Sequence, residues 1–281
     1  MINIIICILC TSFLGLVFKY LKKLPLNLSH VVLVNYFICS ILGIIIKKDE
    51  LFHQESDNYF FSMILGLLFI LGFNFFGRSI VQYGVGMATI VQKLSVIITI
   101  FFALYLGEKL QFIQSIGICL AFSAIYLLFF KNESKKFQLG SNAYILLASF
   151  GVSSLIEMCF LYHSKLQENS KIAMSLTCLI FIFAFTFGLI SHFVQKERKS
   201  INRMEFIYGI ILGIPNFFSI LFLYKSLCSG INGSLFFPLL NISIILISGL
   251  IGFIYFKEKI TNRQLIGYVI AVVAILFIGY H

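Results

Sequence analysis

Long apolar runs alternate with short polar segments along the whole chain. Each run holds roughly 20 mostly apolar residues, the length of α-helix that crosses about 30 Å of hydrocarbon. The polar segments between the runs are too short to fold into a separate domain. The pattern predicts ten membrane-spanning helices, at residues 2–18, 29–46, 59–82, 87–106, 112–130, 142–162, 172–194, 206–227, 233–256 and 264–280.

The composition supports this prediction. The chain is 60% hydrophobic and 11% charged, far more apolar than water-soluble domains are. It carries 21 Lys and Arg residues against 11 Asp and Glu, a formal net charge of +10. The basic residues stand mainly in the polar segments, where they orient the helices and contact lipid headgroups. We therefore expect membrane lipid as a partner and no nucleic acid.

Cysteine and histidine give no sign of a cofactor. All seven cysteines fall inside predicted helices, where they pack as small apolar side chains instead of forming a disulfide framework. Cys7 and Cys10 lie one helical turn apart, but no second pair stands near them, and the five histidines are scattered. We therefore expect neither a metal site nor an organic cofactor.

Two short motifs occur once in each half of the chain. Gly107-Glu108-Lys109 follows the fourth predicted helix, and Lys257-Glu258-Lys259 follows the ninth. Asn-Phe-Phe begins at Asn74 in the third predicted helix and at Asn216 in the eighth. We interpret Glu108 and Glu258 as helix-boundary and capping residues, and the paired motifs as signs of an internal repeat.

The repeated motifs predict two halves of five helices each, residues 1–131 and 140–281. Because five is odd, the second half enters the membrane from the opposite face to the first. Inverted repeats of this kind are an architecture of secondary transporters, whose solute site lies near the middle of the membrane. The predicted fold class is thus an all-α integral membrane protein with ten transmembrane helices in two inverted five-helix repeats.

Four further segments carry a resemblance to a known family. They are Val34-Asn35-Tyr36, Gln92-Lys93-Leu94-Ser95, Pro215-Asn216-Phe217-Phe218-Ser219 and Phe237-Pro238-Leu239-Leu240-Asn241. With them, the chain resembles the EamA-type branch of the drug/metabolite transporter superfamily, whose members carry two five-helix repeats. The resemblance implies a secondary transporter, an exporter or exchanger of a small polar metabolite, amino acid or drug, in the inner or plasma membrane. These motifs mark the family and not the substrate.

Two ionisable residues inside predicted helices are candidate site residues. A charge in hydrocarbon costs from about 2.5 to over 10 kcal/mol, so Lys93 and Glu157 need a reason to be there. Counting about 1.5 Å per residue from the third-to-fourth connection separates them by about 12 Å in depth. We therefore expect Lys93 to bind an anionic group of the solute, and Glu157 to bind a coupling proton beside Lys225. The alternative is that Lys93 reaches the membrane surface and Glu157 stays neutral in a packed core.

Amides and prolines complete the candidate site. Four asparagines inside predicted helices are candidate solute-binding residues: Asn35, Asn74, Asn216 and Asn241. An amide at membrane depth must bond to something, and helix–helix contacts are the alternative to a solute. Pro215 and Pro238 each remove a backbone donor inside a helix, which makes the eighth and ninth helices candidate bending or gating elements.

Other function classes stay open beside a carrier that is not an enzyme. One is an integral-membrane enzyme acting on lipid or prenyl substrates, which needs an acidic or histidine-rich cluster that this sequence does not show. Another is a non-transporting membrane subunit. The sequence also leaves open whether a proton or another ion is coupled, and whether the protein is a monomer or a homodimer.

Two arguments about orientation disagree. More Lys and Arg residues stand on the face of the first connection, which by the positive-inside rule places both chain termini outside the cell. The family resemblance implies that both termini are cytoplasmic. We follow the resemblance, because the individual connections differ by only a few charges.

Overall fold

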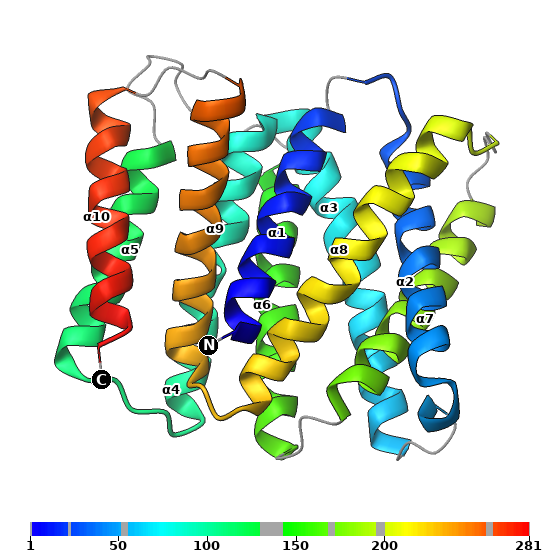
Figure 1. Ribbon diagram of the computed structural model, residues 1–281, viewed down its shortest axis with the longest axis horizontal. Coiled ribbons are helices and arrows are strands. Elements are labelled where there is room, and N and C mark those ends of the chain that lie inside the picture. Colours follow the sequence, from blue (N-terminus) through cyan, green and yellow to red (C-terminus); the bar gives the residue numbers. More distant parts are fainter. Residues whose placement is uncertain are drawn as a thin grey trace. The chain divides into compact units, whose positions relative to one another are not determined.

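The computed structural model describes residues 2–21, 24–51, 56–129, 143–167, 172–194, 200–256 and 261–280. Within these ranges every regular element is an α-helix (Figure 1). The helices are α1 (Ile2–Leu21), α2 (Leu28–Leu51), α3 (Ser56–Leu94), α4 (Val96–Tyr105), α5 (Phe112–Phe129), α6 (Ala143–Leu166), α7 (Ile172–Val194), α8 (Arg203–Cys228), α9 (Gly233–Phe256) and α10 (Asn262–Ile278).

These helices have the lengths and surfaces of membrane spans. Six stretches are long and apolar enough to cross a membrane: Leu28–Ile46, Ser56–Ile80, Ala143–Leu166, Ile172–Val194, Arg203–Cys228 and Gly233–Ile251. Four shorter apolar helical stretches accompany them: Ile2–Phe18, Val91–Tyr105, Phe112–Leu128 and Asn262–Ile278. Large apolar side chains such as Ile45, Phe101 and Leu276 are exposed, which suits contact with lipid. The architecture is that of a multi-pass membrane protein.

The predicted connection at residues 83–86 is wrong. The backbone stays helical through this stretch, α3 ends at Leu94, and the break comes at Ser95. The two glycines in the predicted connection lower helix propensity by only about 1 kcal/mol each, which does not end a helix. At Ser95 the side-chain hydroxyl donates to the carbonyl of Gln92 at 2.6 Å and competes with the backbone ladder.

The helices group into two compact units. Unit 1 comprises Met1–Asn74 and Tyr162–Gly230, and unit 2 comprises Phe75–Leu161 and Ile231–His281. Helices α1, α2, α7 and α8 belong to unit 1, whereas α4, α5, α9 and α10 belong to unit 2. Each unit therefore takes helices from both predicted repeats, and α3 and α6 run from one unit into the other. The repeats are divisions of the sequence and stay a prediction.

In unit 1, α2 packs against both α7 and α8, and α1 packs against α8. Helices α2 and α8 approach closely at two glycines four residues apart on α8. A Cβ added to Gly209 would lie 2.4 Å from Val34, and one added to Gly213 would lie 2.8 Å from Ile38. Small residues at this spacing bring helix backbones together in membranes, where lipid is as apolar as the side chains.

In unit 2, α5 packs along α10, and α4 packs along α9. The N-terminus of α9 is held by a carboxylate from another helix end. Glu108 accepts hydrogen bonds from the backbone amides of Gly233 and Ser234 at 2.9 and 2.8 Å, and so satisfies two donors that the helix leaves unpaired. The prediction that Glu108 is a capping residue is confirmed, and Glu258 lies outside the described residues.

Candidate functional site

Four polar side chains from four helices meet inside unit 2. We call them the Lys93 cluster: Lys93 of α3, Thr99 of α4, Glu157 of α6 and Asn241 of α9. The Lys93 ammonium donates to Asn241 Oδ1 at 2.9 Å, and the Thr99 hydroxyl donates to a Glu157 carboxylate oxygen at 2.7 Å. Lys93 and the Asn241 side chain also act electrostatically on the Glu157 carboxylate. The cluster thus unites a cation, a carboxylate, a hydroxyl and an amide.

The helix break at Ser95 places these side chains together. The Ser154 hydroxyl of α6 donates to the carbonyl of Ser95 at 3.3 Å. Thr99 lies one helical turn after Ser95, and Glu157 lies one helical turn after Ser154. Thr99 therefore shares a helix face with Ser95, and Glu157 shares one with Ser154. The Ser154–Ser95 contact therefore sets Thr99 opposite Glu157.

Asn241 interacts with both charged residues of the cluster. The side chains of Asn241 and Thr99 are buried, whereas Lys93 and Glu157 are half-buried. Although Asn241 interacts with Glu157, its Nδ2 makes no hydrogen bond of normal geometry to any residue in the described ranges. Asn241 therefore connects the two charged side chains, since its Oδ1 accepts from Lys93 and its side chain also interacts with the Glu157 carboxylate.

The count along the helices separates Lys93 and Glu157 by about 12 Å in depth. In the structure both residues interact with Asn241, and Lys93 acts electrostatically on Glu157, so they belong to one cluster. Lys225 lies over the ring of Phe222, with its Nζ 5.6 Å from the ring centroid. It belongs to unit 1 and Glu157 to unit 2, so their predicted pairing stays a prediction.

Two of the predicted solute-binding asparagines bond to each other in unit 1. Asn216 Nδ2 of α8 donates to Asn35 Oδ1 of α2 at 3.2 Å and lies 3.9 Å from the sulfur of Cys39. The Cys39 thiol in turn donates to the carbonyl of Gly213 at 3.2 Å. These contacts join the two helices one turn beyond Gly213. They satisfy one amide group of each asparagine, and solute binding by either one stays a prediction.

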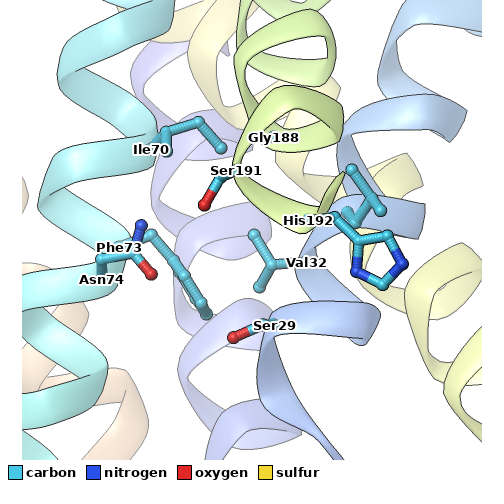
Figure 2. A pocket seen from close by; sticks show the side chains of 9 residues that line it. Ser29, Val32, Ile70, Phe73, Asn74, Gly188, Ser191 and His192 are labelled. Atoms are coloured by element: carbon cyan, nitrogen blue, oxygen red, sulfur yellow. The ribbon is translucent and has the colours of Figure 1, made fainter. Parts of the chain in front are cut away.

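Asn74 lies elsewhere in unit 1. It lines a hollow between α2, α3 and α7 together with Ser29, Ser191 and His192 (Figure 2). The structure therefore sorts the predicted asparagines into three settings. Asn35 and Asn216 form a pair, Asn74 faces a hollow, and Asn241 belongs to the Lys93 cluster.

The EamA-like transporter family model matches residues 1–130. The matched stretch covers α1 to α5 and carries Asn35, Asn74 and Lys93. The resemblance seen in the sequence is confirmed over this part of the chain, and the protein is a multi-pass membrane protein.

Two relatives extend the comparison to nearly the whole chain. A Haemophilus influenzae protein described as uncharacterized is 26% identical over 295 residues, with 99% of this chain and 97% of that protein covered. A solved crystal structure at 13% sequence identity superposes with a TM-score of 0.80, over 98% of this chain and 94% of that one. At that identity the likeness concerns the fold alone.

The two candidate gating prolines lie inside helices, Pro215 in α8 and Pro238 in α9. Pro215 directly precedes Asn216, and Pro238 stands three positions before Asn241. Each proline is therefore within one helical turn of a candidate residue. A proline leaves the carbonyl four residues earlier without its usual helical donor. Their role as bending or gating elements stays a prediction.

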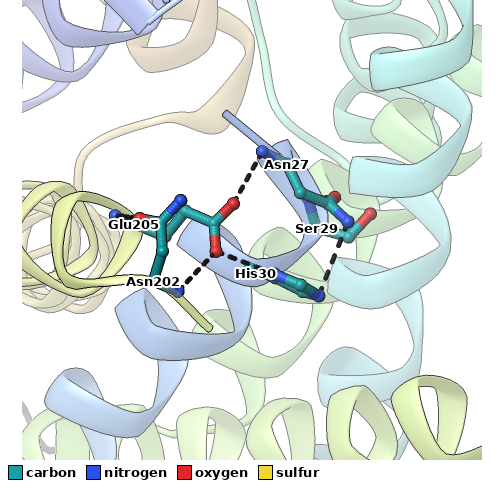
Figure 3. Close-up of polar contacts among 5 residues, drawn as sticks. All are labelled: Asn27, Ser29, His30, Asn202 and Glu205. Atoms are coloured by element: carbon teal, nitrogen blue, oxygen red, sulfur yellow. Dashed lines mark hydrogen bonds and ion pairs between the residues drawn. The ribbon is translucent and has the colours of Figure 1, made fainter. Parts of the chain in front are cut away.

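Sequence reasoning missed a buried ion pair in unit 1. Glu205 of α8 accepts from the backbone amide of Asn27 at 2.9 Å and pairs with His30 Nδ1 of α2 at 2.8 Å (Figure 3). Its carboxylate also closes a capping box with Asn202 at the start of α8. The Asn202 to Glu205 spacing signals the capping box, but nothing in the sequence links it to Asn27 and His30.

A second missed group lies at His163 of α6. Its Nδ1 bonds to the hydroxyl of Tyr224, its Nε2 bonds to Asn58 Oδ1 at 3.0 Å, and the ring of Phe61 stacks on it at 4.0 Å. All of these residues belong to unit 1. Within the described ranges, no three His, Cys, Asp or Glu side chains are placed to hold a metal ion.

Proposed function

We propose that this EamA-like protein is a secondary transporter that moves a small polar metabolite, amino acid or drug across the inner or plasma membrane. It works as an exporter or exchanger by alternating access, with its helices arranged as two inverted repeats, residues 1–131 and 140–281. The proposal rests on the Lys93 cluster. Lys93 and Asn241 bind the solute, and Glu157 carries the coupling proton.

A purely structural role explains the Lys93 cluster poorly. Taking a cation and a carboxylate out of water costs several kcal/mol per ion, and apolar residues of similar volume often stabilise a fold as well or better. In a membrane protein, ionisable side chains inside the spans are therefore functional candidates with their partners. The Lys93 ammonium and Asn241 Nδ2 are both hydrogen-bond donors, which favours a solute with a carboxylate or another group rich in oxygen.

The arrangement also supports coupling between solute and proton. Lys93 acts on Glu157 electrostatically, and Thr99 holds one carboxylate oxygen. A proton that binds to Glu157 changes the charge near Lys93, and so it changes how strongly Lys93 holds an anionic group. By thermodynamic linkage, the solute then changes proton binding by the same factor.

Counterflow into proteoliposomes tests this proposal. Purified protein is reconstituted, the liposomes are loaded with a mixture of amino acids and small carboxylates, and uptake of the radiolabelled mixture is measured across a range of pH values. We expect uptake above that of empty liposomes, a drop of about tenfold or more in Lys93→Ala, and a loss of pH dependence in Glu157→Gln.

Arg263→Ala is the control, because it removes a cation of the same unit whose guanidinium carbon lies 5.3 Å from the ring centroid of Tyr126. Its uptake should stay close to that of the natural protein. Uptake and pH dependence that are unchanged in both Lys93→Ala and Glu157→Gln would remove these two residues from the mechanism. Turnover of a lipid substrate without any solute uptake would favour the enzyme alternative.

A further inference from the structure

The Lys93 cluster pairs one positive side chain with one negative side chain. The groups that act on the Glu157 carboxylate come from three other helices, and they are Lys93 of α3, Thr99 of α4 and Asn241 of α9. Lys93 is the one charged group among them within the described part of the chain. With Glu157 ionised, the cluster without a solute is therefore electrically neutral.

A solute carboxylate changes this charge balance. When it binds to the Lys93 ammonium, a second negative charge comes close to Glu157. Two carboxylates that share one site do not both ionise, because each makes the other bind a proton more tightly. A net charge inside a membrane span is costly as well. One proton taken up by Glu157 removes both costs and leaves the loaded cluster neutral.

Thr99 suits both protonation states of Glu157. Its hydroxyl donates to the ionised carboxylate at 2.7 Å. A hydroxyl also accepts hydrogen bonds, and inside a helix it can donate to the carbonyl four residues earlier, which for Thr99 belongs to Ser95. When Glu157 is protonated, the Thr99 hydroxyl can turn toward Ser95 and accept from the new carboxyl group. The cluster thus holds a proton without losing a hydrogen bond.

We infer that each solute carboxylate binds to the Lys93 cluster together with one proton, so that a monocarboxylate crosses the membrane as the uncharged acid. This inference rests on the proposed transport function and narrows its solute to one with a single carboxylate. A dicarboxylate or a phosphate brings a further negative charge. The described residues place no second cation beside Glu157 to neutralise it.

A zwitterionic amino acid is the alternative occupant, and it predicts the opposite pH dependence. Its ammonium would neutralise Glu157 in place of the proton, so the solute and the proton would compete, and uptake would weaken as the pH falls. The cluster already has donors on Lys93, Thr99 and Asn241 and a single carboxylate to accept them. This excess of donors favours a solute that brings acceptors and no second ammonium.

Proteoliposomes with the purified full-length protein test the inference. They contain a dye that reports internal pH, and valinomycin with a potassium gradient sets the membrane potential. Three sets of radiolabelled probes are compared across a range of pH values: lactate, pyruvate and glycolate; malate, succinate and fumarate; and alanine, valine and leucine. Uptake into liposomes without protein is subtracted.

We expect the monocarboxylates to enter fastest, and the dicarboxylates to enter about tenfold or more slowly. Monocarboxylate uptake should rise as the pH falls, by up to about tenfold per pH unit, because one proton binds with each anion. It should carry about one proton per solute. The membrane potential should not change its rate, because the acid crosses without net charge.

Glu157→Gln gives the decisive comparison, because it keeps the volume of the side chain and removes its charge and its proton. Monocarboxylate uptake by this variant should carry no proton, and its rate should depend on the membrane potential, since the anion then crosses alone. Asp57→Asn is the control, because it removes an exposed carboxylate from the first turn of α3. It should behave as the natural protein does.

The outcomes separate this inference from the proposed function. Monocarboxylate uptake that moves net charge in the natural protein, or that stays proton-coupled in Glu157→Gln, would overturn the inference and leave transport intact. Faster uptake of the dicarboxylates or the amino acids would do the same. No uptake from any of the three sets would overturn both. If Glu157→Gln does not fold, the proton count and the response to potential of the natural protein decide.

Discussion

Glu157 shows how a carboxylate is kept inside an apolar helix. The residues directly before and after it on α6, Ile156 and Met158, are apolar, and the hydroxyl of Thr99 on α4 donates to it at 2.7 Å. Lys93 supplies a positive charge nearby. A hydrogen bond to a charged group contributes about 1.5–3 kcal/mol, more than a neutral one does. Thr99 is therefore expected to matter both for the stability of unit 2 and for the chemistry of Glu157.

Thr99→Val tests that expectation, since valine has the shape of threonine without the hydroxyl. We expect a lower apparent unfolding temperature in detergent, by an amount that corresponds to about 1–3 kcal/mol, because Glu157 loses its donor. Thr186→Val is the matched control. Thr186 is exposed, and its hydroxyl bonds to the carbonyl of Ile182 in its own helix. If both variants unfold at the same temperature, the Thr99–Glu157 contact has no net effect on stability.

The sequence identified charged residues more readily than their partners. Lys93 and Glu157 stand out because each interrupts an apolar run, and this can be read from one helix alone. Thr99 does not stand out, since threonine is common in membrane helices and its partner is 58 residues away in the sequence. The pair of His30 and Glu205 was missed for the same reason. Periodicity gives the face of a helix but not which other helix covers it.

At the scale of whole helices, glycines decide how closely α2 and α8 approach. Gly213→Ala should destabilise the protein, because the new Cβ would lie 2.8 Å from Ile38 Cβ and 3.1 Å from the carbonyl oxygen of Asn35. We expect a loss of about 1–3 kcal/mol, the usual effect of overpacking, measured as thermal unfolding in detergent. The helices would also move apart beside the bond between Asn35 and Asn216.

Gly151→Ala is the control for this prediction. It makes the same change inside α6, where a new Cβ would meet no atom within 4 Å. Alanine is the better helix former by up to about 1 kcal/mol, so this variant should be as stable as the natural protein or more stable. A Gly213→Ala variant that matches Gly151→Ala in stability would show that the α2–α8 contact tolerates separation.

The helices themselves were largely predictable, because a long apolar run in lipid must satisfy its own backbone hydrogen bonds, as a helix does. The predicted spans 172–194 and 233–256 coincide with α7 and α9. The failure at residues 83–86 has a physical cause. Glycines often mark turns in water. In an apolar environment, breaking helical backbone hydrogen bonds costs more free energy, so the helix continues through both glycines and is interrupted at Ser95.

For the molecule as a whole, the packing units differ from the sequence repeats. Unit 1 combines α1 and α2 with α7 and α8, and unit 2 combines α4 and α5 with α9 and α10. Corresponding helices of the two predicted halves thus share a unit: α2 with α7 in unit 1, and α4 with α9 and α5 with α10 in unit 2. Long-range contacts of this kind leave no periodic signal in the chain, so the sequence could suggest a duplication but not this exchange.

The number of crossings in each half decides the inverted-repeat proposal, and the stretch Val91–Tyr105 is the critical one because it is shorter than a usual span. If it crosses, the first half has five spans and the connection after Lys131 lies on the opposite face to both chain termini.

We therefore expect an epitope inserted after Lys131 in the full-length chain to differ in accessibility from epitopes at the N- and C-termini. The assay uses an impermeant antibody on sealed vesicles of known orientation. A Lys131 epitope on the same face as the N-terminus would mean an even number of crossings, and the second half could then not be an inverted copy of the first. The same vesicles settle the disagreement between loop charge and family resemblance, since cytoplasmic termini require both end epitopes to be protected in right-side-out vesicles.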